Sequence, residues 1–128
     1  MSVGDAFDCL AALHADRWGK AFEPRFATFH RSLSAELLSL GRLVLVLLEV
    51  GGEIVASKYD FAYGGKIWCY QGGWKKSLAA DRLGHVMLAR VLRWAIEHGY
   101  REYDFLAGDA PYKRRWGNAE RNTMTMAC

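Results

Sequence analysis

The segment Tyr100-Arg-Glu-Tyr-Asp-Phe-Leu-Ala-Gly-Asp-Ala-Pro-Tyr-Lys-Arg-Arg-Trp-Gly117 decides both the fold and the site that we expect in this chain. Its first half predicts a strand, because Tyr103, Phe105 and Leu106 favour β-structure and Gly108 ends the run. Acidic, phenolic, basic and indole side chains follow directly, at Asp109, Tyr112, Lys113, Arg114, Arg115 and Trp116. Ligands of open α/β sheets bind beyond the carboxyl ends of strands, so the pattern predicts a ligand site here. The alternative is a solvated basic turn with Trp116 folded onto the core.

A long amphipathic helix is predicted immediately before this strand, over residues 84–98, with Gly99 ending it. Its expected buried stripe comprises Leu88, Val91, Leu92, Ala95 and Ile96. A polar loop, 75–82, joins it to an earlier strand. Strand, helix and strand in this order predict a crossover that leaves the last strand parallel to the one before the helix.

Three antiparallel strands are predicted upstream, over 43–50, 53–63 and 66–74, because Gly51-Gly52 and Gly64-Gly65 are hairpin signals. The first run consists of leucine and valine apart from Glu49, which is typical of a strand buried on both faces. The second alternates, and its two expected faces are Val55, Tyr59, Phe61 and Tyr63 against Ile54, Ala56, Lys58 and Asp60. The third ends in two glycines, which favour either a bulge or a close approach of another backbone.

Two helices are predicted at the start of the chain. The first covers 5–18 with Asp5 as its N-cap, and the second runs from Pro24 to a stop at Gly41. The second is expected to bury one face, made of Phe26, Phe29, His30, Leu33, Leu37 and Leu40, with Ser34 away from it. We interpret His14 and this aromatic stripe as core packing. Residues 118–128 alternate weakly and are a candidate for a short C-terminal edge strand.

Length and composition predict a single domain over 1–128. With 52% hydrophobic and 24% charged residues, the chain is globular rather than disordered. A net charge of +3 is too small to argue for DNA binding. Three widely spaced cysteines indicate reduced thiols in a cytoplasmic compartment, and no pair of Cys or His has a metal-ligand spacing. We also expect no signal peptide and no membrane insertion, since the longest apolar run is short.

The order of these elements resembles the GNAT acyltransferase fold, which implies a mixed α/β sheet. Several segments are similar to the GNAT-type domain of the bacterial cellulose-biosynthesis (CelD-like) group: 42–63, 84–99, 103–109 and 112–117. That group is itself similar to the Fem-type peptidoglycan aminoacyltransferases. Members are usually longer, and the usual first strand is absent here. The resemblance therefore leaves open an incomplete domain, or one that pairs with a second GNAT-like domain or forms a homodimer.

The resemblance also implies where coenzyme A would bind. In the family, backbone amides at the start of the long helix hold the pyrophosphate. The matching residues here are Arg82, Leu83, Gly84, His85 and Val86, with Asp81 in place of the family's Gln or Arg. We add Gln71, Gly72 and Gly73 as candidate cofactor-binding residues, since their backbone permits close approach. The expected reaction is transfer of an acyl group, from acetyl-CoA, to a small-molecule or sugar-linked amine in cell-envelope or exopolysaccharide metabolism.

Four residues of the opening segment are candidates for catalysis. Asp104 or Asp109 could act as base, Lys113 could stabilise an oxyanion or a phosphate, and Tyr112 could protonate the leaving group. The alternatives are structural: Asp104 would accept backbone hydrogen bonds, Asp109 would cap a turn and Tyr112 would belong to the core. Two other functions stay open, namely a non-catalytic binding or assembly module and a Fem-like transferase that uses aminoacyl-tRNA. The latter, or a nucleotide-linked ligand, would bind through Lys75, Lys76 and 113–115.

Overall fold

The computed structural model describes residues 1–107 and 110–122, with backbone alone for 79–81. The chain forms nine elements: α1 (Val3–Trp18), α2 (Pro24–Ser39), β1 (Leu43–Val50), β2 (Glu53–Tyr63), β3 (Lys66–Trp74), the 3₁₀ helix η1 (Lys76–Asp81), α3 (Leu83–Glu97), β4 (Glu102–Asp104) and α4 (Pro111–Trp116). The strands form one sheet in the order β1-β2-β3-β4.

The sheet has the mixed topology that the sequence predicts. β1, β2 and β3 are antiparallel neighbours, and β4 pairs with β3 in parallel after the α3 crossover. Both glycines of each hairpin turn have positive φ, between +59° and +81°, which is the backbone that type I′ turns require. The predicted strand boundaries 43–50, 53–63 and 66–74 are therefore confirmed.

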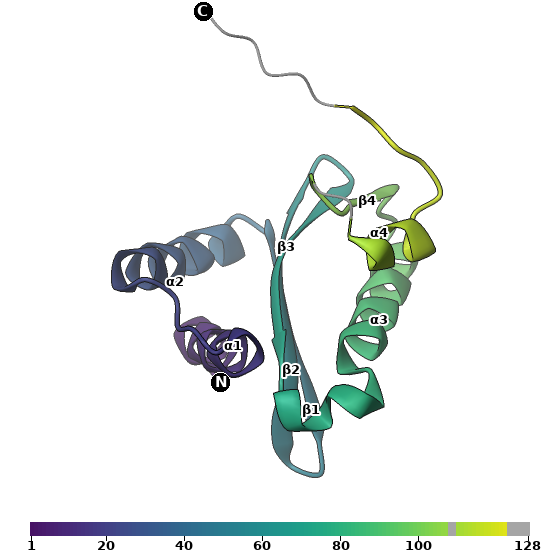
Figure 1. The fold of residues 1–128 in the computed structure, drawn as a ribbon. Coiled ribbons are helices and arrows are strands. Elements are labelled where there is room, and N and C mark those ends of the chain that lie inside the picture. Colours follow the sequence, from purple (N-terminus) through teal and green to yellow (C-terminus); the bar gives the residue numbers. More distant parts are fainter. Residues whose placement is uncertain (108–109, 123–128) are drawn as a thin grey trace, which may run out of the picture.

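Helices cover both faces of the sheet. α1 and α2 lie on one face, and α3 and α4 lie on the other (Figure 1). On the α1 face, Phe7 and Leu10 pack against Tyr59 of β2. On the α3 face, Met87 and Val91 pack against the first half of β2. The core is thus split by the sheet into two apolar layers.

Two bulges interrupt the sheet, and the first changes the predicted faces of β2. The β1–β2 register shifts between Leu48 and Glu49 and leaves Val55 as the extra residue, so Val55 packs on the α3 side beside Ala56. The prediction that Val55 shares a face with Tyr59 is therefore wrong. The second shift lies between Tyr59 and Asp60, and it leaves Tyr70 as the extra residue of β3. Such bulges re-aim side chains locally.

Three other predictions for the N-terminal half are wrong. The N-cap of α1 is Ser2, whose hydroxyl accepts from the Asp5 N–H, and not Asp5 itself. α2 buries only His30 and Ser34, while Phe29 is 61% exposed, because this helix lies at the margin of the sheet. β1 is the edge strand and buries Val44 alone, so it is not buried on both faces.

The C-terminal half differs from its prediction at three places. Ile96 is 76% exposed, since the buried stripe of α3 runs through Leu83, Met87, Leu88, Val91 and Ala95. The basic triplet 113–115 belongs to a short helix, α4, rather than to a turn. Residues 117–122 form no strand, and the remainder of the predicted edge strand lies outside the described residues.

Candidate active site

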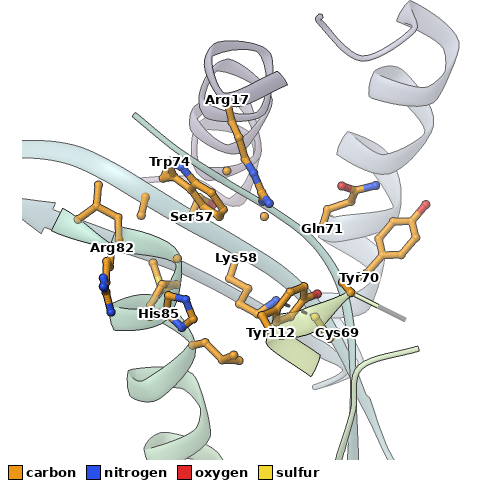
Figure 2. A pocket seen from close by; sticks show the side chains of 18 of the residues that line it. Arg17, Ser57, Lys58, Cys69, Tyr70, Gln71, Trp74, Arg82, His85 and Tyr112 are labelled. Atoms are coloured by element: carbon orange, nitrogen blue, oxygen red, sulfur yellow. Dashed lines mark hydrogen bonds between the residues drawn. The ribbon is translucent and has the colours of Figure 1, made fainter. Parts of the chain in front are cut away.

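A cavity of about 770 Å³ lies where β3 and β4 separate. The two strands pair only between Lys66–Trp68 and Glu102–Asp104, so the rest of β3 has no strand beside it on that edge in the described structure. The cavity is enclosed by this edge, the end of α1, the start of α3 and α4 (Figure 2). Its size is that of a small-molecule site.

The start of α3 forms one wall. Its N-cap residue, Arg82, has φ +53° and makes no side-chain cap hydrogen bond, so the positive end of the helix dipole has no side-chain cap. Four of the predicted cofactor-binding residues line the cavity, namely Arg82, Leu83, Gly84 and His85, whereas Val86 is 40% exposed and does not line it.

The glycines of this region have packing reasons of their own. A Cβ at Gly84 would lie 2.7 Å from Cζ3 of Trp74, so the glycine lets the indole pack against α3. A Cβ at Gly73 would lie 2.6 Å from the backbone N of His14, so the close approach that the sequence predicts is made by α1. Gln71 and Gly72 line the cavity beside them.

α4 carries two of the predicted catalytic residues to the cavity. Tyr112 lines it, and burial raises the pKa of its hydroxyl, so the phenol is protonated at neutral pH. Lys113 also lines it and donates from Nζ to the carbonyl oxygen of Ala107 at 2.8 Å. Trp116 Nε1 donates to His85 Nδ1 at 3.2 Å, which joins α4 to α3.

The structure places Asp104 away from the cavity lining. Its carboxylate accepts from the Leu106 N–H at 2.7 Å and lies 3.2 Å from Lys66 Nζ. Desolvation opposes ionisation, but these partners outweigh it and lower the pKa of Asp104. The contacts support Leu106, which has a positive φ of 63°. Asp109 lies outside the described residues, as does the side chain of Asp81.

Sequence reasoning missed a cluster of polar groups at the floor of the cavity. Lys58 Nζ donates to Asp60 Oδ1 at 3.2 Å and to Cys69 Sγ at 2.9 Å. Asp60, whose side chain is fully buried, also accepts from the Tyr70 N–H at 3.1 Å and from Tyr103 Oη at 2.6 Å. The sequence did contain a sign of this cluster, because Lys58 and Asp60 lie in the middle strand of the predicted meander, where solvent reaches neither face freely.

The lining carries an excess of positive charge. Five of the lining residues are basic: Arg17, Lys58, Arg82, Lys113 and Arg115. Where lining side chains are described, none is Asp or Glu. The Arg17 guanidinium stacks over the Trp74 ring at 3.4 Å from the centroid, and its desolvation lowers the pKa of the group. The site therefore suits an anionic ligand.

Two features are absent from the described part of the chain. No group of three or more His, Cys, Asp or Glu side chains lies close enough to hold a metal ion there. Within the same residues, no helix has the length and apolar character to cross a membrane.

Known proteins match this chain at two levels. The family model of the acetyltransferase (GNAT) domain matches residues 2–114. No curated protein matches the sequence. Among solved structures, the complex of AAC(6')-Iy with the bisubstrate analogue CoA-S-monomethyl-acetylneamine has a TM-score of 0.67 and 12% identity, over 97% of this chain and 92% of that chain.

Two further solved structures have the same fold. The aminoglycoside 6'-N-acetyltransferase AAC(6')-IG from Acinetobacter haemolyticus matches with a TM-score of 0.66 and 11% identity, over 97% of this chain and 92% of that chain. An aminoglycoside acetyltransferase from an uncultured soil metagenomic sample, in complex with sisomicin, matches with a TM-score of 0.65 and 13% identity, over 100% of this chain and 91% of that chain. At this level of identity the likeness establishes the fold.

Proposed function

The chain belongs to the family of acetyltransferase (GNAT) domains, and from this premise we propose that it transfers an acetyl group from acetyl-CoA to the amine of a small molecule. The observation that carries the proposal is the cavity at the separation of β3 and β4, which joins an uncapped helix start to a protonated phenol. The helix start can bind the phosphates of the acetyl donor, and the phenol of Tyr112 can donate a proton to the leaving sulfur.

The residues present fit coenzyme A. The start of α3 offers a helix dipole and backbone N–H groups to the diphosphate, and Arg82 adds a guanidinium on the same wall (Figure 2). The unpaired edge of β3, from Cys69 to Trp74, offers backbone donors and acceptors to the two amides of an extended pantetheine arm. Coenzyme A would supply the activated thioester.

The chain's own residues would then perform the transfer. The acceptor nitrogen forms a bond to the acyl carbon, the carbon–sulfur bond breaks, and the sulfur takes up a proton. Tyr112 is the proton donor that we assign, since its hydroxyl lines the cavity in protonated form. Lys113 donates to the Ala107 carbonyl oxygen and so positions α4. We therefore assign Lys113 the role of positioning Tyr112, which lies on the same helix. Of the two candidate bases, Asp109 lies closer to α4 along the chain, and we retain it as the proposed base.

Calorimetric titration with acetyl-CoA, followed by an assay of thiol release with a panel of amines, tests the function. Wild-type protein should bind acetyl-CoA in the micromolar range, and Arg82→Ala should weaken binding about tenfold through loss of a charged contact. Arg90→Ala is the matched control, because Arg90 lies on the exposed part of the same helix. Absence of binding to the wild type would contradict the proposal.

The resemblance to the CelD-like group supports a narrower proposal, in which the acceptor is an amine of cell-envelope or exopolysaccharide metabolism. Its most specific support is the motif from Asp104 to Trp116. The Fem-like alternative predicts transfer from aminoacyl-tRNA, and the assembly-module alternative predicts a stable complex without turnover. Assays with acetyl-CoA and with charged tRNA in parallel separate the three. A cytoplasmic location and a homodimer or second GNAT-like domain remain predictions.

A further inference from the structure

Lys58 is a fixed positive charge at the floor of the cavity. Its side chain is 12% exposed, and its ammonium lies against Asp60, whose side chain is fully buried. Burial alone would lower the pKa of Lys58, but the Asp60 carboxylate and Cys69 outweigh it and raise that pKa. The amine is therefore charged at neutral pH and does not act as a base.

The ammonium has a donor left over for a ligand. Of its three N–H groups, one is directed to Asp60 Oδ1 and one to Cys69 Sγ. Lys58 lines the cavity together with Cys69, so the remaining N–H is available to a molecule bound there (Figure 2). Asp60 is held in turn by Tyr103 and the Tyr70 N–H, which fixes the ion pair in place. A charged donor held in this way binds a negatively charged oxygen.

The diphosphate of acetyl-CoA, as assigned above, does not account for Lys58. The diphosphate is assigned to the start of α3 and Arg82, whereas Lys58 extends from β2, within the sheet. Arg17, from α1, adds a second cation to the lining, with its guanidinium over the Trp74 ring. Lys58 and Arg17 thus add basic groups to the cavity from β2 and α1, and the described lining side chains include no carboxylate.

We propose that the acceptor is an amine that also carries an anionic group, a carboxylate or a phosphate, and that Lys58 binds this group. The inference rests on the proposed function, since it names the acceptor class of the same site. A polyamine without an anion gains no such contact.

Pairs of acceptors that differ only in the anion test the proposal. Tyrosine is compared with tyramine, and glucosamine 6-phosphate with glucosamine, so that the pairs separate a carboxylate from a phosphate. Binding of each compound is measured by calorimetry, with and without saturating acetyl-CoA. The test variant is the double substitution Lys58→Met with Asp60→Asn, because Lys58→Met alone would leave a buried carboxylate without its cation. Lys58→Arg keeps the charge.

A second double variant, at an ion pair outside the cavity, serves as the control for the Lys58–Asp60 variant. Arg93 and Glu97 form an exposed ion pair on α3, 3.0 Å apart, and neither lines the cavity. Arg93→Met with Glu97→Gln therefore makes the same change of charge at a distance. Circular dichroism and thermal unfolding establish that each variant is folded before it is titrated.

The expected result is that at least one anionic compound binds about tenfold to hundredfold more tightly than the compound of the same pair that lacks the anionic group. The Lys58–Asp60 variant should lose this preference, whereas Lys58→Arg and the Arg93–Glu97 control should keep it. Equal binding of both members, the same preference in the Lys58–Asp60 variant, or no binding of any anionic member at millimolar concentration overturns the proposal. Failure of acetyl-CoA to bind overturns the proposed function separately, since the titrations without it still report on Lys58.

Discussion

Trp116 donates its indole N–H to Nδ1 of His85 at 3.2 Å, and the two rings lie nearly parallel, 6.2 Å apart. The bond joins α4 to the first turn of α3 across 31 positions of sequence. It also assigns the tautomer, since a neutral His85 that accepts at Nδ1 carries its proton at Nε2. Because α4 has only six residues, this contact and the bond from Lys113 to Ala107 help to keep Tyr112 at the cavity.

Replacement of Trp116 by Phe should therefore weaken catalysis more than folding. Loss of one hydrogen bond is worth about 1 kcal/mol, and we expect kcat/KM for acetyl-CoA to fall about fivefold, with little change in Tm. Trp94→Phe is the control, because Trp94 stacks on His98 at the far end of α3 and lies outside the cavity. Equal rates for wild type and Trp116→Phe would show that α4 does not need this bond.

Gly84→Ala should destabilise the protein, against the usual effect of alanine in a helix. In an open helix alanine is favoured over glycine by about 1 kcal/mol. Here its Cβ would lie 2.7 Å from the Trp74 ring, and we expect a net loss of about 1–3 kcal/mol. Urea unfolding measures this loss, and Trp74→Leu should relieve it in the double variant. If Gly84→Ala stabilises the wild type, then the glycine is retained for a ligand and not for Trp74.

The fold was predictable because its signals are local. The paired glycines at 51–52 and 64–65 demand positive φ, and the helical period of 84–98 requires a buried stripe. Burial of residues at the margins of the sheet was not predictable from local sequence. It depends on which strand lies at the sheet edge and on what covers that strand. The exposure of Phe29 and the edge position of Leu43–Val50 follow from that arrangement.

The candidate site was predictable in part, for the same reason. Tyr112, Lys113 and His85 come together at the cavity because the residues after β4 and the start of α3 meet beyond the end of the β3–β4 pairing. The pair of Lys58 and Asp60 was missed because an alternating strand predicts solvent on its polar face. Its burial depends on Tyr103, 43 positions later, and on the extra residue in β3.

Asp104→Asn separates a catalytic from a positioning role. Asparagine keeps an acceptor for the Leu106 N–H but loses the charge that Lys66 contacts. If Asp104 only positions the loop, then kcat should change less than threefold. Acid unfolding is the second readout. The pKa of Asp104 is lowered in the folded state, so its contribution is present above the unfolded pKa of 3.8 and is lost as pH falls through the folded pKa. The variant should lose that dependence. A fall in kcat of a hundredfold or more would instead make Asp104 the base.

Tyr112→Phe should reduce kcat about tenfold to hundredfold and leave the Kd of acetyl-CoA within about twofold, since a proton donor acts in the transition state. The pKa of Tyr112 is raised above its ordinary value of 10.0, so acid catalysis should persist at neutral pH and be lost as pH rises through the raised pKa. The variant should lack this alkaline limb. Tyr63→Phe is the matched control, because Tyr63 is 62% exposed at a hairpin. Unchanged kcat in Tyr112→Phe would remove the phenol from the mechanism.

The buried pair of His30 and Tyr59 should limit stability at both ends of the pH scale. Nδ1 of His30, on α2, lies 3.1 Å from Oη of Tyr59, on β2, and both residues are buried. The His30 ring also stacks on Tyr70 of β3. Desolvation lowers the pKa of His30, so its contribution is present above the unfolded pKa of 6.5 and is lost as pH falls toward the folded pKa.

Burial acts on Tyr59 in the opposite direction and raises its pKa from 10.0 to about 12. Its contribution is therefore present below pH 10 and is lost as pH rises from 10 to about 12. We expect the free energy of unfolding, measured in urea, to be highest between about pH 7 and pH 9.5 and to fall on both sides. Tyr59→Phe should flatten the alkaline side, and His30→Gln the acid side. Because Tyr63 is exposed at a hairpin, Tyr63→Phe should change neither limb. A curve that is unaltered in Tyr59→Phe would mean that another group governs alkaline unfolding.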